Sequence, residues 1–98
     1  MSASSSNSRT FAAGELIFRE GDLGKEMYII RSGKVQVTRA RGDGEVVLDS
    51  FGPNEFFGEM SLFGDPRRSA DVRAMEETSV LVINRRMLEA QFRNIPDW

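Results

Sequence analysis

The sequence predicts a mainly β domain, a sandwich or a barrel, that ends in a short helix. The first observation is that nine glycines punctuate the 98 residues, so turn signals arrive at intervals of roughly ten residues, as in β sandwiches and barrels. The second is that the stretches between these turns are short, apolar and rich in β-branched and aromatic residues. A chain of this length fits one hydrophobic core.

Six segments have strand composition, and we expect six to eight strands in total. They are residues 15–18, 27–32, 34–39, 45–51, 69–74 and 78–84. Gly33 suits a tight reversal between the second and third segments, and RGDGE at 41–45 predicts a hairpin tip before the fourth. The last segment, TSVLVIN, is apolar enough to lie inside the domain.

Two helical segments are expected among and after the strands. GEMSLF at 58–63 has the pattern of one short helical turn. After the last strand, Asn84 can cap a helix that Pro96 ends. The apolar residues of that helix recur at helical spacing at Met87, Leu88, Phe92 and Ile95.

The composition excludes several classes of function. The formal charge is −2, from 13 basic and 15 acidic residues, so no general positive field favours nucleic acid or an acidic membrane surface. Histidine and cysteine are both absent, which removes the parts of zinc sites, of Cys or Ser/His nucleophiles and of disulfides. We therefore expect no catalysis, no metal and no cofactor.

Nothing in the sequence has the character of a membrane span or of an export signal. No apolar run approaches the roughly 20 residues that a span needs, and residues 1–8, MSASSSNS, lack the basic and apolar regions of a signal peptide. This serine-rich stretch reads as a disordered tail or leader. We expect the fold to begin at residue 9 and the protein to be cytoplasmic.

The segment from Gly58 to Ser69 has the residues of an anion pocket. A helix start exposes unpaired backbone N–H groups, so the amides of Met60 and Ser61, after a glycine without a Cβ, can hold a phosphate. Arg68 can close such a site with charge-assisted bonds, and Ser69 supplies one more donor.

Glu59 needs a different partner, because a carboxylate beside a phosphate repels it. A carboxylate accepts hydrogen bonds, so it suits a sugar hydroxyl that donates one. A ligand with both a phosphate and a free ribose hydroxyl satisfies Glu59 and Arg68 together. The sequence therefore indicates a nucleotide.

Each of these residues also has a structural interpretation. Gly58 can be a turn glycine, Glu59 a helix-start acid, and Arg67 with Arg68 a solvated pair balanced by neighbouring aspartates. Taken alone, each is more often structural than functional. Their joint arrangement favours the binding site.

The stretch FGEMSLFGDPRRSADVRA at 57–74 resembles the phosphate-binding cassette of the cyclic nucleotide-binding domain family. The opening strands of that domain are similar to AGELIFREGDLGKEMYIIRSGKVQVT at 13–38, and the resemblance covers nearly all of residues 9–95. Ser69 makes the cassette more similar to the bacterial catabolite-activator type than to the protein kinase A regulatory subunits, which have alanine there.

This resemblance implies an eight-stranded β jelly roll, a double-stranded β-helix, with a short cassette helix and a C-terminal helix. Residues 9–98 would form the domain without the full C-terminal lid helix. The ligand would be cAMP or cGMP, held in a regulatory module that acts on an effector domain or a partner protein and touches neither nucleic acid nor membrane.

The resemblance also assigns roles to individual residues. Glu59 would take the ribose 2′-hydroxyl and Arg68 the exocyclic phosphate oxygens. Ser69 stands where a hydroxyl helps to favour guanine in some members, although serine is also compatible with cAMP. Backbone groups would come from Gly58, Met60 and Ser61. Arg67 would lie on the outside, because neighbours in a strand face opposite ways.

Two alternatives stay open at this point. A ligand-free structural or docking β roll could retain the cassette as a remnant. An enzyme on a similar β roll is the other, with a site made of carboxylates alone, although no paired spacing marks an acid and a base among them. The available carboxylates are Glu20, Asp22, Glu26 and Glu59.

Overall fold

The computed structural model describes residues 7–92, which form eight strands and two helices. The strands are β1 Ser8–Phe11, β2 Leu16–Phe18, β3 Glu26–Ser32, β4 Val35–Arg41, β5 Gly44–Phe51, β6 Phe56–Phe57, β7 Asp71–Ala74 and β8 Thr78–Asn84. The helices are α1 Met60–Phe63 and α2 Arg85–Phe92. All six expected strands are present.

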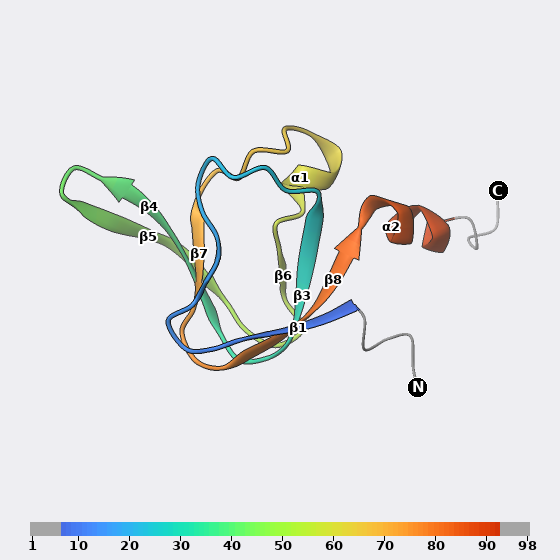
Figure 1. Ribbon diagram of the computed structural model, residues 1–98, viewed down its shortest axis with the longest axis horizontal. Coiled ribbons are helices and arrows are strands. Elements are labelled where there is room, and N and C mark those ends of the chain that lie inside the picture. Colours follow the sequence, from blue (N-terminus) through green and yellow to red (C-terminus); the bar gives the residue numbers. More distant parts are fainter. Residues whose placement is uncertain (1–6, 93–98) are drawn as a thin grey trace.

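The strands form two antiparallel sheets, in the orders β1-β8-β3-β6 and β2-β7-β4-β5. Figure 1 shows the sheets on either side of the domain, with α1 beside the start of β3 and the end of β6, and with α2 directly after β8. The mainly β jelly roll that the sequence and the resemblance predicted is confirmed. Strand β8 lies between β1 and β3, which agrees with its apolar sequence.

The core lies between the two sheets, where alternate residues of each strand point inward. Ile30, Val35 and Val80 are wholly buried, and each such side chain contributes about 1.5–3 kcal/mol when it leaves water. Three rings, Phe18, Tyr28 and Phe57, pack together with centroids 5.1–6.1 Å apart. These rings lie next to the pocket described below.

Strands β4 and β5 form a long hairpin that projects from the domain (Figure 1). Their last paired residues are Arg41 and Gly44, so the loop has two residues and lies within the hairpin tip expected at 41–45. Most of β5 is exposed.

The expected turn at Gly33 is present between β3 and β4. Gly33 has φ +99°, and a Cβ there would overlap the side chain of Thr78, so glycine is required. The structure adds that the two strands it joins belong to different sheets. The turn carries the chain from one layer to the other and does not form a hairpin.

The start of the fold also differs slightly, while both helices agree with the sequence. Strand β1 begins at Ser8, one residue before the expected start, because the chain pairs with β8 from that point. The backbone N–H of Met87 donates to Asn84 Oδ1 at 2.8 Å, which confirms the predicted cap of α2. The expected end at Ile95 and Pro96 lies outside the described residues. No helix within residues 7–92 is long and apolar enough to cross a membrane.

Candidate functional site

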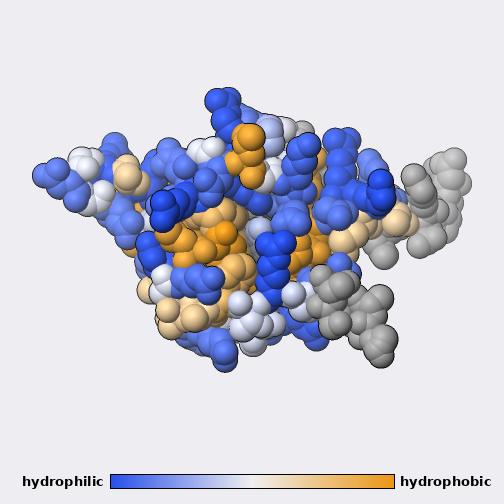
Figure 2. Space-filling model, in the orientation of Figure 1, coloured by the Kyte–Doolittle hydropathy of each residue, from blue (hydrophilic) through white to orange (hydrophobic). Residues whose placement is uncertain are grey.

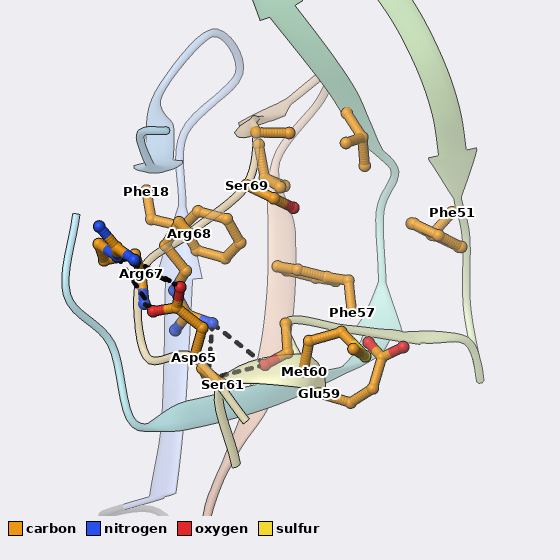
Figure 3. A pocket seen from close by; sticks show the side chains of 14 residues that line it. Phe18, Phe51, Phe57, Glu59, Met60, Ser61, Asp65, Arg67, Arg68 and Ser69 are labelled. Carbon is orange, nitrogen blue, oxygen red and sulfur yellow. Dashed lines mark hydrogen bonds and ion pairs between the residues drawn. The ribbon is translucent and has the colours of Figure 1, made fainter. Parts of the chain in front are cut away.

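A cavity of about 340 Å³ opens beside α1. It is lined by Phe18, Val37, Phe51, Phe57, Gly58, Glu59, Met60, Ser61, Asp65, Arg67, Arg68, Ser69, Ala70 and Val72. All six residues predicted to bind ligand are among them. Figure 2 shows apolar side chains at the surface in the middle of the molecule, bordered by hydrophilic ones, and Figure 3 shows the pocket from close by.

Arg68 is the most buried charged residue of this pocket, with 6% of its surface exposed. One terminal nitrogen, Nη1, donates to the carbonyl of Gly58 at 3.1 Å and to Ser61 Oγ at 2.9 Å. The other, Nη2, donates to the carbonyl of Glu26 at 2.9 Å. These bonds join the segment before α1 to β3 through one side chain.

Aromatic rings and glycines surround the guanidinium of Arg68. Its central carbon lies 4.1 Å from the centroid of Phe18 and 5.8 Å from that of Tyr28, within the range of cation–π attraction. A Cβ on Gly24 would overlap the guanidinium, and one on Gly58 would lie 3.0 Å from Nη1. Gly58 also has φ +81°, which favours glycine independently.

The sequence reasoning did not identify Phe18 and Gly24 as part of the site. In the sequence, Gly24 belongs to EGDLG, which indicates a turn, and Phe18 belongs to a segment with strand composition. Both lie more than forty positions before Arg68 in the chain. No local pattern shows that the fold brings them together.

No carboxylate within residues 7–92 forms an ion pair with Arg68. Its described partners are two carbonyl oxygens and one hydroxyl, all neutral. A buried cation without an opposite charge is unfavourable, because it has lost water without gaining a counter-charge. The pocket therefore presents a fixed positive charge that an anion would compensate.

Arg67 lies at the rim of the pocket, and its side chain is 69% exposed. It pairs with Asp65 through Nη2 to Oδ2 at 2.9 Å, and Nε donates to the same carboxylate. Hydrogen bonds from Arg67 lower the pKa of Asp65, and the Asp65 carboxylate in turn raises the pKa of Arg67. The expectation that Arg67 lies on the outside is confirmed, since its charge is already satisfied at the surface.

Glu59 stands directly before α1 in helical backbone geometry, and its side chain makes no capping hydrogen bond. Figure 3 shows its carboxylate well apart from the guanidinium of Arg68, on the side of the pocket near Phe51 and Phe57. As expected, one pocket therefore contains both a carboxylate, from Glu59, and a guanidinium, from Arg68. The two groups do not neutralise each other.

The other predicted residues line the same pocket with different exposure. Met60 is largely exposed, Ser61 is buried and Ser69 is exposed. The first backbone hydrogen bond of α1 runs from Leu62 N–H to the Glu59 carbonyl at 3.0 Å. The N–H groups of Met60 and Ser61 come before this bond, at the helix start, where N–H groups have no partner within the helix. Ser61, predicted to offer its backbone, also holds Arg68 through its hydroxyl.

The wall opposite these polar groups is apolar and comes from both sheets. Val37, Phe51, Phe57 and Val72 contribute to it, and the rings of Phe51 and Phe57 are stacked at 6.5 Å. Behind them, burial raises the pKa of the Tyr28 phenol, and the nearby charge of Glu26 raises it further. No group of three or more potential metal ligands occurs in the part of the chain that the structure describes.

Comparison with known proteins identifies the family. Residues 8–94 match the profile of the cyclic nucleotide-binding domain. The chain is 42% identical over 89 residues to the cyclic AMP receptor protein of Thermus thermophilus, which covers 90% of this chain and 41% of that protein. It is 36% identical to the cyclic nucleotide-gated channel beta-3 of Canis lupus familiaris, over 92% of this chain and 12% of the channel.

Solved structures agree. The catabolite activator protein of Thermus thermophilus superposes with a TM-score of 0.81 at 41% identity, over 88% of this chain and 41% of that one. The EAL enzyme Bd1971 in a halfsite-occupied form gives a TM-score of 0.89 at 31% identity, over 92% of this chain and 81% of that one. These relatives thus include regulators, channels and a protein named as an enzyme.

The chain spans about two fifths of the length of the receptor protein and about an eighth of that of the channel. The shared part is the domain itself, and the match to the family covers both sheets, α1 and the pocket residues from Gly58 to Ser69. The chain therefore belongs to the cyclic nucleotide-binding domain family.

Proposed function

We propose that a cyclic nucleotide binds in the pocket beside α1, with its phosphate on Arg68 and its ribose 2′-hydroxyl on Glu59. The observation that carries this assignment is the burial of the Arg68 guanidinium without a carboxylate partner within residues 7–92. A phosphate supplies the missing negative charge. It also accepts the planar, paired hydrogen bonds that a guanidinium donates.

Arg68 keeps donors for that phosphate. An arginine has five N–H groups, and the three bonds to Gly58, Ser61 and Glu26 leave two of them. One is the Nε–H, which donates to no described residue. The other is the second N–H of Nη2, and a phosphate can accept from both.

Glu59 and the backbone before α1 complete the polar half of the site. The Glu59 carboxylate accepts a hydrogen bond from the 2′-hydroxyl, and it lies on another side of the pocket than Arg68, which binds the phosphate (Figure 3). Backbone N–H groups of Met60 and Ser61, together with Gly58, face the same ligand. Hydrogen bonds to a charged group contribute about 1.5–3 kcal/mol each.

The nucleobase would pack against the apolar wall that includes Val37 and Phe51, since every base has a face that stacks on apolar or aromatic side chains. Ser69, exposed at the pocket, offers a hydroxyl to the base or to the phosphate. It is compatible with both adenine and guanine. The related receptor protein is named for cyclic AMP, and the EAL enzyme has been solved with cAMP and with cGMP.

In this proposal the module acts without breaking a bond and without a metal or cofactor. The ligand shifts the domain between two states, and an effector domain or a partner protein in the cytoplasm responds. The greater length of the related regulators and channels supports such a partner.

Titration of the purified chain with cAMP and with cGMP tests the proposal. We expect saturable heat in calorimetry and, in amide NMR spectra, shifts centred on the residues from Gly58 to Ser69. The absence of a saturable response to either nucleotide would contradict the proposal and favour a ligand-free docking role. Adenosine, which lacks the phosphate, is the control and should bind far more weakly.

A further inference from the structure

The side chain of Arg39 makes a contact that the nucleotide site does not explain. It extends from β4, where it is exposed, and both Nε–H and an Nη2–H donate to the carbonyl oxygen of Ser69, at 3.1 and 2.9 Å. Two donors from one rigid guanidinium fix the direction of the acceptor as well as its distance. The contact ties β4 to the pocket residue that follows Arg68.

The position of Arg39 in the sheet explains why this carbonyl needs a side-chain partner. Strand β4 pairs with β7 from Val35 opposite Ala74 to Thr38 opposite Asp71, and the ladder ends there. Ser69 lies two residues before Asp71, in irregular backbone. Arg39 is the next residue of β4, and its side chain provides the link that the ladder no longer provides.

The backbone of Arg68 is held from another direction. Its N–H donates to the carbonyl of Asp22 and its carbonyl accepts from the N–H of Gly21, both at 2.8 Å. The pair Arg68–Ser69 is thus fixed by the turn at 21–22 and by Arg39 on β4. Of these contacts, the bonds from Arg39 are the ones made by a side chain, so a substitution can remove them and leave the backbone ladder intact.

We propose that Arg39 is a positioning residue for the segment Arg68–Ser69, and this inference rests on the proposed function. It holds the Arg68–Ser69 backbone in the arrangement that the ligand meets. A segment that is already ordered loses less conformational freedom on binding, so affinity is higher. Without Arg39 the ligand would have to order this segment itself.

The experiment compares three variants of the full chain by calorimetric titration with cAMP and cGMP. Arg39→Ala removes the contact. Arg39→Lys keeps the charge but not the fork. Arg41→Ala is the matched control, because Arg41 is exposed on the same strand and no side-chain bond from it occurs within residues 7–92. Melting temperatures, compared with that of the wild type, check that the three variants keep the fold.

We expect Arg39→Ala to weaken binding roughly three- to tenfold, the range of one net hydrogen bond. Arg39→Lys should weaken it nearly as much, and Arg41→Ala should leave it unchanged. In the ligand-free protein, the ¹³C shift of the Ser69 carbonyl should move in both Arg39 variants and stay constant in Arg41→Ala. A general loss of stability would not change the ¹³C shift of this one carbonyl alone.

Equal affinities for Arg39→Ala and Arg41→Ala would overturn the inference. So would wild-type affinity for Arg39→Lys, since charge alone would then suffice. If Arg39→Ala has a clearly lower melting temperature than the wild type, the affinities of Arg39→Lys and Arg41→Ala are compared instead. Equal affinities of these two variants would overturn the inference. If the wild-type chain binds neither nucleotide, the proposed function fails, and an unmoved Ser69 carbonyl would separately overturn the positioning contact.

Discussion

Arg67 and Arg68 are neighbours in the chain with the same side chain, yet they meet opposite surroundings. Arg67 is exposed at the rim and pairs with Asp65, so solvent and a carboxylate share its charge. Arg68 is buried under Phe18, and its described partners are neutral. An exposed pair of this kind contributes little, whereas a buried cation without a counter-charge is a site for an anion.

The difference arises from backbone direction and from the loop at 21–24. Leu23 forms a β-bridge with Arg67, and the Arg68 N–H donates to Asp22, so the chain there is briefly extended and its side chains alternate. The alternation sends Arg68 inward, where Gly24 leaves space for its guanidinium. Two identical residues therefore acquire different functions from one feature of the local fold.

The largest effect is expected from Arg68→Ala. Removing the cation leaves the phosphate without its charged partner, which should cost roughly 2–5 kcal/mol of binding, or about 30-fold to several thousand-fold in affinity. Calorimetry with cAMP measures it. Arg68→Lys should recover only a small part, because an ammonium cannot replace the guanidinium fork. If Arg67→Ala weakened binding more than Arg68→Ala, the assignment of the two arginines would be reversed.

A smaller effect is expected from Glu59→Gln. The amide oxygen still accepts a hydrogen bond but lacks the negative charge, so affinity for cAMP should fall roughly ten- to a hundredfold. The matched ligand is 2′-deoxy-cAMP, which has no hydroxyl to donate. Wild type and Glu59→Gln should bind this analogue almost equally. An undiminished effect of the substitution on the analogue would mean that Glu59 does not act through the 2′-hydroxyl.

Much of the fold and of the candidate site was predictable from the sequence, and there is a physical reason why the rest was not. The turn spacing and strand composition predicted the β fold, and the segment from Gly58 to Ser69 predicted the pocket residues, because these signals are local. Strands β1 and β6 were not expected as separate elements. Each is short, and long-range pairing with β8 and β3 stabilises them.

The surroundings of Arg68 depend on contacts between distant parts of the chain. Phe18 and Gly24 meet its guanidinium only when β2 and the following loop pack beside the segment before β7. A single sequence contains no signal for that encounter. The same applies to Gly33, whose turn was evident although the two sheets that it connects were not.

Gly24→Ala should lower stability through Arg68. The added Cβ overlaps the guanidinium, and overpacking of this kind typically costs about 1–3 kcal/mol. In an Arg68→Ala background the overlap disappears, so the same substitution should have little effect. Gly44→Ala is the control, since a Cβ there meets no atom. Denaturant unfolding of the four variants measures the coupling, and additive losses would show that Gly24 does not hold Arg68.

Arg67→Ala should have a small effect on ligand affinity. Its charge lies at the rim, is exposed and is shared with Asp65, so the loss should stay below about fivefold. The loss should also diminish in high salt, because exposed charges are screened. A loss as large as that of Glu59→Gln, or one that salt leaves unchanged, would place Arg67 in contact with the ligand.

The smallest effect concerns Asp65 and acid pH. Bonds from Arg67 lower the pKa of this carboxyl below its ordinary value of 3.8. A carboxyl whose folded pKa is depressed contributes stability above its unfolded pKa, and that contribution disappears as the pH falls through the folded pKa. Arg67→Ala should therefore raise the Asp65 pKa toward 3.8, as followed by ¹³C NMR titration. Arg68→Ala should leave it unchanged, because Arg68 makes no bond to Asp65; an equal rise in both variants would mean that the two arginines share this carboxylate.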